Sequence, residues 1–136
     1  MIFTKRLFAA LAASAILLSG CGEESSIFIR TVIPADAQMK STMEADGYQA
    51  AVIGDFDSVG YSIFTASNGK TGEDYDGLLV MRAKDEKDLE EQESETRSAE
   101  KDNIVVFVRK NDPEYGNVMV AGTESAIRAA GITLGD

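Results

Sequence analysis

The segments GLLVMRA (77–83) and NIVVFVRK (103–110), joined by KDEKDLEEQESETRSAEKD (84–102), decide the fold of this chain. Four consecutive apolar residues in the first segment predict a central strand that is covered on both faces. The second segment has the strongest strand pattern of the chain, because Ile104 to Val108 is apolar on both faces. The connection of 19 residues is long enough for a helical crossover between them.

The connecting segment, Lys84 to Asp102, is the outlier in composition, with nine carboxylates, four basic residues and strong helix formers. Its apolar side consists only of Leu89, Thr96 and Ala99. A helix with so narrow an apolar side faces solvent or is not stable alone. We therefore expect a surface helix that adds little to the core, and a partly disordered acidic segment is the alternative.

The other segments carry weaker patterns of the same two kinds. A helix is expected to begin after Pro34 and to end at Gly47, with Met39 and Met43 one turn apart in the core. The segments from Tyr48 to Ile53 and from Val59 to Ala66 are expected to pair as a hairpin. Further strands are expected at 27–33, 117–121 and 132–134, the last at a sheet edge, and a further helix at 123–130, capped by Thr123 and with Ile127 facing inward.

The resulting order, β-α-β-β-β-α-β-β-α, predicts an α+β fold. We expect a single, mostly antiparallel sheet with helices on one face, with a ferredoxin-like split β-α-β core as the leading topology. No repeat or internal boundary is seen, so residues 27–136 are expected to form one domain. The helix, Gly47-Tyr48 and three strands with a glycine-bearing loop, over residues 35–83, are also similar to the PepSY domains of envelope proteins.

The N-terminus carries the most specific motif in the chain. Lys5 and Arg6 precede the run from Leu7 to Leu18, in which only Ser14 is polar, and the run leads into Leu18-Ser19-Gly20-Cys21. A charged region, a short apolar region and small residues at a cleavage point form a signal peptide. The run is shorter than the roughly 20 apolar residues that a spanning helix needs.

With cysteine directly after the small residues, this segment resembles the lipobox of bacterial lipoproteins. The resemblance implies that residues 1–20 are cleaved and that Cys21 becomes the lipidated first residue, followed by a short tether to residue 26. Two or more acyl chains anchor a protein stably without spanning the bilayer. In a diderm bacterium, Gly22 after the cysteine favours the outer membrane, facing the periplasm, by family analogy.

Composition excludes several functions. The chain contains no histidine and Cys21 is its only cysteine, so Ser-His-Asp, Cys-His and zinc chemistries are excluded. From residue 21 onward there are 11 basic and 23 acidic residues, a net charge of −12. A surface that binds nucleic acid needs clustered basic residues, so nucleic acid is not an expected partner. The excess charge is explained either by solubility or by capture of a basic protein or cation.

Two acidic loops, around Asp55-Phe56-Asp57 and Glu73-Asp74-Tyr75-Asp76-Gly77, are the candidates for chemistry. Oxygen-rich loops with glycine can hold Ca²⁺. Neither loop has the twelve-residue EF-hand spacing, and nothing in the sequence positions their carboxylates as a glycosidase acid/base pair. We therefore expect no metal, no cofactor and no catalytic residue.

The sequence thus predicts a non-enzymatic, lipid-anchored envelope protein that binds a basic envelope protein, as an immunity or exclusion lipoprotein does. The alternative is a structural accessory subunit of an envelope or secretion assembly. A small hydrolase is disfavoured by the absence of histidine. The expected partner contacts are three carboxylates of the charged segment and two tyrosines in polar loops: Glu90, Glu91, Glu95, Tyr75 and Tyr115.

Overall fold

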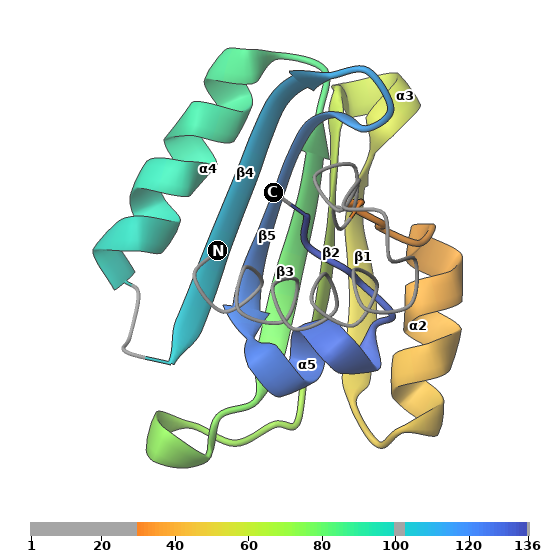
Figure 1. Cartoon of the computed structure of the whole chain (residues 1–136), viewed down its shortest axis with the longest axis vertical. Coiled ribbons are helices and arrows are strands. Elements are labelled where there is room, and N and C mark those ends of the chain that lie inside the picture. Colours follow the sequence, from red (N-terminus) through yellow and green to blue (C-terminus); the bar gives the residue numbers. More distant parts are fainter. Residues whose placement is uncertain (1–29, 100–102, 136) are drawn as a thin grey trace, which may run out of the picture. The chain divides into compact units, whose positions relative to one another are not determined.

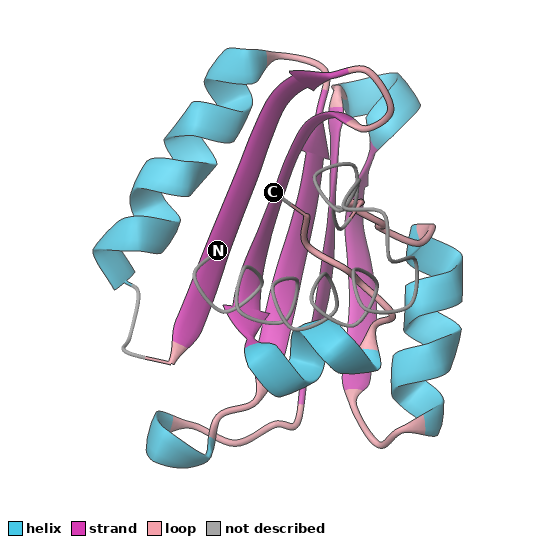
Figure 2. Cartoon of the chain, in the orientation of Figure 1, coloured by secondary structure: helices cyan, strands magenta, loops and turns pink. Residues whose placement is uncertain are grey.

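The computed structural model describes residues 30–99 and 103–135. Residues 34–131 form one compact unit, and the described residues at the two ends of the chain belong to a second. The larger unit holds a five-stranded sheet with helices (Figures 1 and 2). Its elements are α2 (Asp36–Ala45), β1 (Gln49–Asp55), α3 (Phe56–Val59), β2 (Tyr61–Ser67), the 3₁₀ helix η2 (Gly72–Asp74), β3 (Gly77–Ala83), α4 (Glu86–Ala99), β4 (Ile104–Asp112), β5 (Gly116–Thr123) and α5 (Glu124–Ala129).

The sheet has the strand order β1-β2-β3-β5-β4, and every neighbouring pair is antiparallel. The α+β class and the antiparallel sheet are therefore confirmed. Strand β3 occupies the centre, as its apolar run predicts, and its bounds agree with the expected ones. Strand β4 has the strongest strand pattern but lies at an edge, because β5 inserts between it and β3.

The ferredoxin-like arrangement is not confirmed. Strands β3 and β4 both pair antiparallel with β5, so they run parallel to each other and are joined by α4. This part follows a split β-α-β plan. Strands β1, β2 and β3 instead form an antiparallel meander, which that fold does not contain.

The expectation that the helices share one face of the sheet is wrong. Leu89 of α4 packs against Met81 and Met119, which lie directly opposite each other on β3 and β5. Asp36, in the first turn of α2, instead pairs with Arg82 at 3.4 Å. Since successive residues of a strand point to opposite faces, Met81 and Arg82 place α4 and α2 on opposite sides.

Local signals place α2 where the sequence predicts it. Gly47 has a φ of 95°, and the amide groups of Gly47 and Tyr48 donate to the carbonyls of Glu44 and Met43. This is the Schellman arrangement, which satisfies the last carbonyls of a helix and requires a left-handed residue after its end. Met39 is fully buried, as is Met43, so both are core residues as expected.

Neither expected terminal strand forms in the part of it that the structure describes. Residues 27–29 lie outside the described part, and residues 30–33 contain only a single bridge, between Val32 and Thr133. That bridge consists of two backbone hydrogen bonds of 2.8 and 2.9 Å. Residues 30–33 and 132–134 therefore add no strand to the five-stranded sheet, because their backbone bonds are exchanged with each other.

Candidate protein-binding surface

The acidic helix α4 begins directly after the central strand. The Asp85 side chain accepts a hydrogen bond from the Lys87 amide at 2.8 Å. It therefore caps the helix, because an amide in the first turn has no acceptor within the helix itself. Acidic Glu86 and Asp88 lie in the first turn and basic Arg97 in the last, which matches the helix dipole. The surface helix expected from Lys84 to Asp102 is thus confirmed over its described residues.

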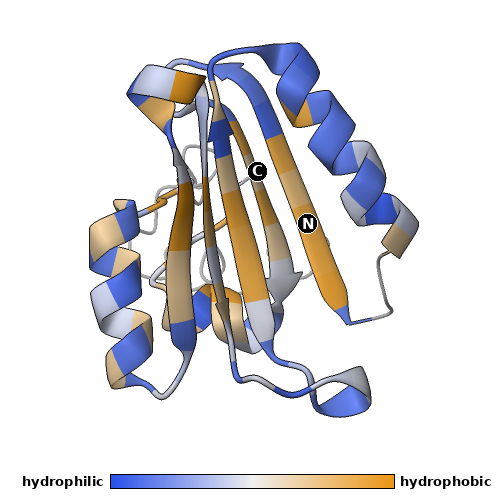
Figure 3. Ribbon diagram, turned by 180° about the vertical axis from the view of Figure 1, so that it is seen from behind, coloured by the Kyte–Doolittle hydropathy of each residue, from blue (hydrophilic) through white to orange (hydrophobic). Residues whose placement is uncertain are grey.

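One residue fastens α4 to the sheet. Leu89 is fully buried, while its neighbours Glu90 and Glu91 are exposed. Leu89 packs with Met81, Met119 and other apolar side chains of the sheet. Figure 3 shows the contrast between the hydrophilic helix and the apolar strands beside it. The helix therefore contributes to the core through a single side chain, so its outer face can vary without loss of packing.

The carboxylates of α4 differ in whether a cation neutralises them. Glu90 pairs with Lys110 of β4 at 2.8 Å, and Glu93 pairs with Arg97 at 2.9 Å. The hydrogen bond from Lys110 lowers the pKa of Glu90, and the same contact raises the pKa of Lys110. Glu95 is exposed and makes no ion pair with any other residue in the described part of the chain.

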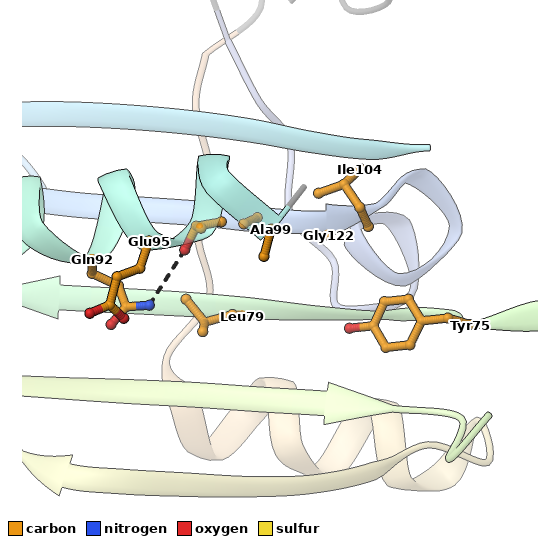
Figure 4. A pocket seen from close by; sticks show the side chains of 9 residues that line it. Tyr75, Leu79, Gln92, Glu95, Ala99, Ile104 and Gly122 are labelled. Atoms are coloured by element: carbon orange, nitrogen blue, oxygen red, sulfur yellow. Dashed lines mark hydrogen bonds between the residues drawn. The ribbon is translucent and has the colours of Figure 1, made fainter. Parts of the chain in front are cut away.

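A groove of about 400 Å³ lies between the C-terminal half of α4 and the sheet. In Figure 4, Gln92 and Glu95 stand at one end, Tyr75 stands at the other, and Leu79 lies between them. Gln92 donates to the Thr96 hydroxyl at 3.4 Å, which bridges one turn of the helix. The lining residues come from the loop before β3 and from β3, α4, β4 and β5: Tyr75, Leu79, Gln92, Glu95, Thr96, Ala99, Ile104, Ala121 and Gly122.

The structure brings together two of the five expected contact residues. Tyr75 and Glu95 both line the groove, although they are 20 positions apart in sequence. Burial, and then the charge of Asp76, raises the pKa of Tyr75, so its hydroxyl stays protonated at neutral pH. Glu90 and Glu91 lie on the exposed part of the same helix.

Tyr115 is not part of this surface. It lies in the turn between β4 and β5, whereas Ile104 and Gly122 mark the opposite end of that hairpin. Eight residues of strand separate the two ends, which is about 25 Å at the usual rise per residue. Tyr115 is half-buried, and its amide donates to Asp112 at 2.8 Å.

The two acidic loops, at which the sequence predicts no metal or catalytic site, contain carboxylates with structural partners. Asp76 accepts hydrogen bonds from Tyr48 at 2.7 Å, from Ser125 at 2.7 Å and from the Thr123 hydroxyl. Burial alone would raise the pKa of Asp76, but the hydrogen bonds from Thr123, Tyr48 and Ser125 outweigh burial and lower it. Its oxygens therefore tie the loop before β3 to the start of α5.

Asp55 has a comparable local role. It caps α3 by accepting from the Asp57 amide at 3.2 Å and from the Ser58 hydroxyl at 2.8 Å. Within residues 30–99 and 103–135, no group of three or more acidic or thiol side chains is arranged to hold a metal ion. Hydrogen bonds within the protein thus hold the carboxylates of Asp55 and Asp76 in place.

A second exposed surface lies at the opposite edge of the sheet from α4. Ile53 is 53% exposed and Val59 is 55% exposed, and Val52 and Phe56 beside them are also exposed. Val52 points to the opposite face of the sheet from Ile53, since successive strand residues alternate. The other three residues, Ile53, Phe56 and Val59, lie on the edge strand and on the short helix that follows it, and we call them the β1–α3 apolar patch. Exposed apolar residues that gather in one place often mark contacts with another protein.

Comparison with protein-family models, with curated proteins and with solved structures found no significant match to this chain. Cys21 and the tether expected up to residue 26 lie outside the described residues. Among the residues that are described, no helix is long and apolar enough to cross a membrane.

Sequence reasoning missed the groove and the β1–α3 apolar patch. Leu79 and Ile104 were expected as ordinary strand residues, and Phe56 and Val59 as parts of a turn and a strand. For the groove, the available signal was the small apolar side of the segment 84–102. Leu89, Thr96 and Ala99 are too few to cover a whole face of the sheet. Such a narrow stripe indicates that part of the face beneath it stays open.

Proposed function

We propose that this protein is a lipid-anchored component of the bacterial envelope that binds another protein, without catalysis, through the acidic surface formed by α4 and the adjoining groove. The lipobox supports the anchor, and the charge of the chain supports a basic partner. The observation that carries the proposal is the arrangement of α4. Its outer carboxylates are exposed, and only Leu89 of this helix is buried.

A partner with excess positive charge would associate rapidly with such a surface. Complementary charges raise association rates strongly at low salt, and the effect weakens as the ionic strength rises. An inhibitory or immunity-like module needs this behaviour, because it has to capture its target before the target acts. The acyl chains at Cys21 would hold the module at the membrane where such a target arrives.

Replacing Glu90, Glu91 and Glu95 together with glutamine tests the binding surface. The partner would first be identified by site-specific photocrosslinking from position 91 in intact cells. The triple variant should then associate with it more slowly and with a flatter dependence on salt, while the circular dichroism spectrum stays unchanged. A matched control removes three exposed carboxylates elsewhere, by Asp46→Asn, Asp57→Asn and Glu73→Gln, and should have a smaller effect. Equal effects of the two triple variants would refute a localised binding surface.

The anchor is tested separately. Cys21→Ser should abolish the incorporation of labelled palmitate and leave the unprocessed precursor, because the sulfur is the expected acceptor of the lipid. Palmitate labelling that survives this substitution would refute the lipoprotein assignment. The binding proposal would then still stand or fall on the glutamine variants alone.

A structural accessory subunit of an envelope assembly is the second candidate, and the β1–α3 apolar patch favours it. The patch lies at the β1 edge of the sheet, away from strands β3, β5 and β4, which α4 contacts. A subunit held within an assembly needs two separate contact surfaces. Ile53→Ser and Val59→Ser should release it from that assembly but leave a simple inhibitory module active.

A further inference from the structure

We propose that the groove between α4 and the sheet binds a lysine or arginine side chain of the basic partner, with the alkyl stem on Leu79 and the cationic head at Glu95. This inference rests on the proposed function and names the chemistry that the same surface recognises. It is carried by three features of the groove: its size, its apolar floor and the position of its charge.

The size suits one long side chain and the backbone next to it. Pockets for small ligands usually measure about 300–1,000 Å³, and this groove, at about 400 Å³, is near the lower limit. It is bounded on one side by a single helix and lies open along its length, so a side chain can enter without rearrangement of the sheet.

The floor suits an alkyl stem. Leu79, Ile104 and Ala121 come from three adjacent strands and form an apolar surface beneath α4. Lysine and arginine lay their methylene groups along such surfaces while keeping the charged head near polar groups. Gly122 lines the same floor with backbone alone and leaves room for the stem.

The charge suits a cation. Of the lining residues that the structure describes, Glu95 is the only charged one. Glu90 and Glu93 are already paired with Lys110 and Arg97, whereas Glu95 has no such partner among the described residues. Gln92, beside Glu95 in Figure 4, donates to Thr96 through its amide nitrogen and keeps its carbonyl oxygen as an acceptor. An anionic ligand would be repelled at this end of the groove.

Tyr75 stands at the far end of the groove from Glu95 (Figure 4). Tyr75 is half-buried and lines the groove, so its ring is placed to contact the residue beside the cationic one in the partner. A carboxylate at one end and an aromatic ring at the other favour an extended basic segment over a compact ligand, because only an extended segment contacts both.

The test uses small probes and needs no partner protein. N-acetyl-arginine amide and its uncharged isostere N-acetyl-citrulline amide are titrated into the folded protein and followed by ¹H–¹⁵N chemical shifts. Arginine amide should shift the amides of Leu79, Thr96 and Gly122 and should bind about fivefold or more tightly than citrulline amide, since only the charge-assisted bond distinguishes them.

Three variants locate the site. Glu95→Gln should remove the preference for arginine, while Asp57→Asn, which removes an exposed carboxylate outside α4 and the groove, should keep affinity within about twofold. Ala99→Leu should fill the groove and weaken both probes, with little cost to the helix because leucine is a good helix former. All three positions are exposed, so the variants should fold.

Several results would overturn the proposal. Equal binding of the two probes would show that the groove does not distinguish a charged side chain from an uncharged one. Equal losses in Asp57→Asn and Glu95→Gln would reduce the effect to the net charge of the protein, and tighter binding of free spermidine would assign the groove to polyamines. These results leave the anchored binding function standing, since a basic partner could still meet the outer face of α4. Conversely, arginine binding with no effect of the triple variant on the partner would refute only the proposed function.

Discussion

Truncation of Leu89 to alanine is the most direct test of how α4 is held, and therefore of the groove beneath it. Leu89 is fully buried against Met81 and Met119, which are themselves 4% and 0% exposed. Replacing a buried leucine with alanine costs about 2.7–5 kcal/mol, depending on how far the surroundings collapse into the cavity. A surface helix can move inward, so we expect about 3 kcal/mol, toward the lower end of that range.

Urea unfolding followed by circular dichroism measures this change. With a slope of about 1–3 kcal/mol/M, a loss of about 3 kcal/mol lowers the midpoint by about 1–3 M. Leu89→Met keeps most of the volume and should cost less than about 1.5 kcal/mol. Glu91→Ala, on the exposed side of the same helix, should stay within about 0.5 kcal/mol of the parent.

The comparison between Leu89→Ala and Glu91→Ala decides the matter. If the two variants unfold at the same urea concentration, α4 is not packed on the sheet, and both the core and the groove described above would be wrong. If Leu89→Ala alone is destabilised, arginine amide should also bind it more weakly, because a loosened helix no longer fixes the position of Glu95.

Three further outcomes are expected. Gly122→Ala should cost about 1–3 kcal/mol of stability, because the new Cβ would lie 2.6 Å from the Gly77 carbonyl oxygen and 2.7 Å from the Leu78 Cα. An unchanged melting temperature in thermal unfolding would contradict this packing. Because the pKa of Asp76 is lowered on folding, its contribution to stability is present above about pH 4 and is lost as the pH falls through the pKa of the folded state. Asp76→Asn should therefore reduce the fall of the urea midpoint at acid pH, and an unaltered fall would refute this role. Burial and the hydrogen bond to Asp76 raise the pKa of Tyr48 to about 12, so its contribution to stability is present below about pH 10 and declines as the pH rises toward 12. Tyr48→Phe should remove the tyrosine ionisation of highest pKa in a titration followed at 295 nm, and persistence of that ionisation would count against the assignment.

Several elements of the fold could be predicted from residues that are close together in the sequence. The bounds of β3 follow from an unbroken apolar run, and the end of α2 follows from Gly47, because few other residues adopt its backbone conformation. Thr123 caps α5 as expected, accepting from the Ala126 amide at 3.3 Å. Each of these features depends on residues within about four positions of one another, so the sequence contains all the information that they need.

The strand order and the faces of the sheet were decided by tertiary structure. A period of two shows that a strand has two faces, but it does not say which helix covers either one. Both 27–33 and 103–110 have good strand patterns. The second forms a strand, whereas the described part of the first, residues 30–33, holds a single bridge, since pairing depends on a neighbour supplied from elsewhere in the chain.

The candidate site divides in the same way. The sequence alone determined the acidity of α4, the exposure expected of Glu90, Glu91 and Glu95, and the absence of histidine chemistry, because composition and helical periodicity are local properties. Only the tertiary structure placed Tyr75 and Glu95 at the two ends of one groove and separated Tyr115 from them. The insertion of β5 between β3 and β4 fixes where α4 lies, and therefore where the groove opens.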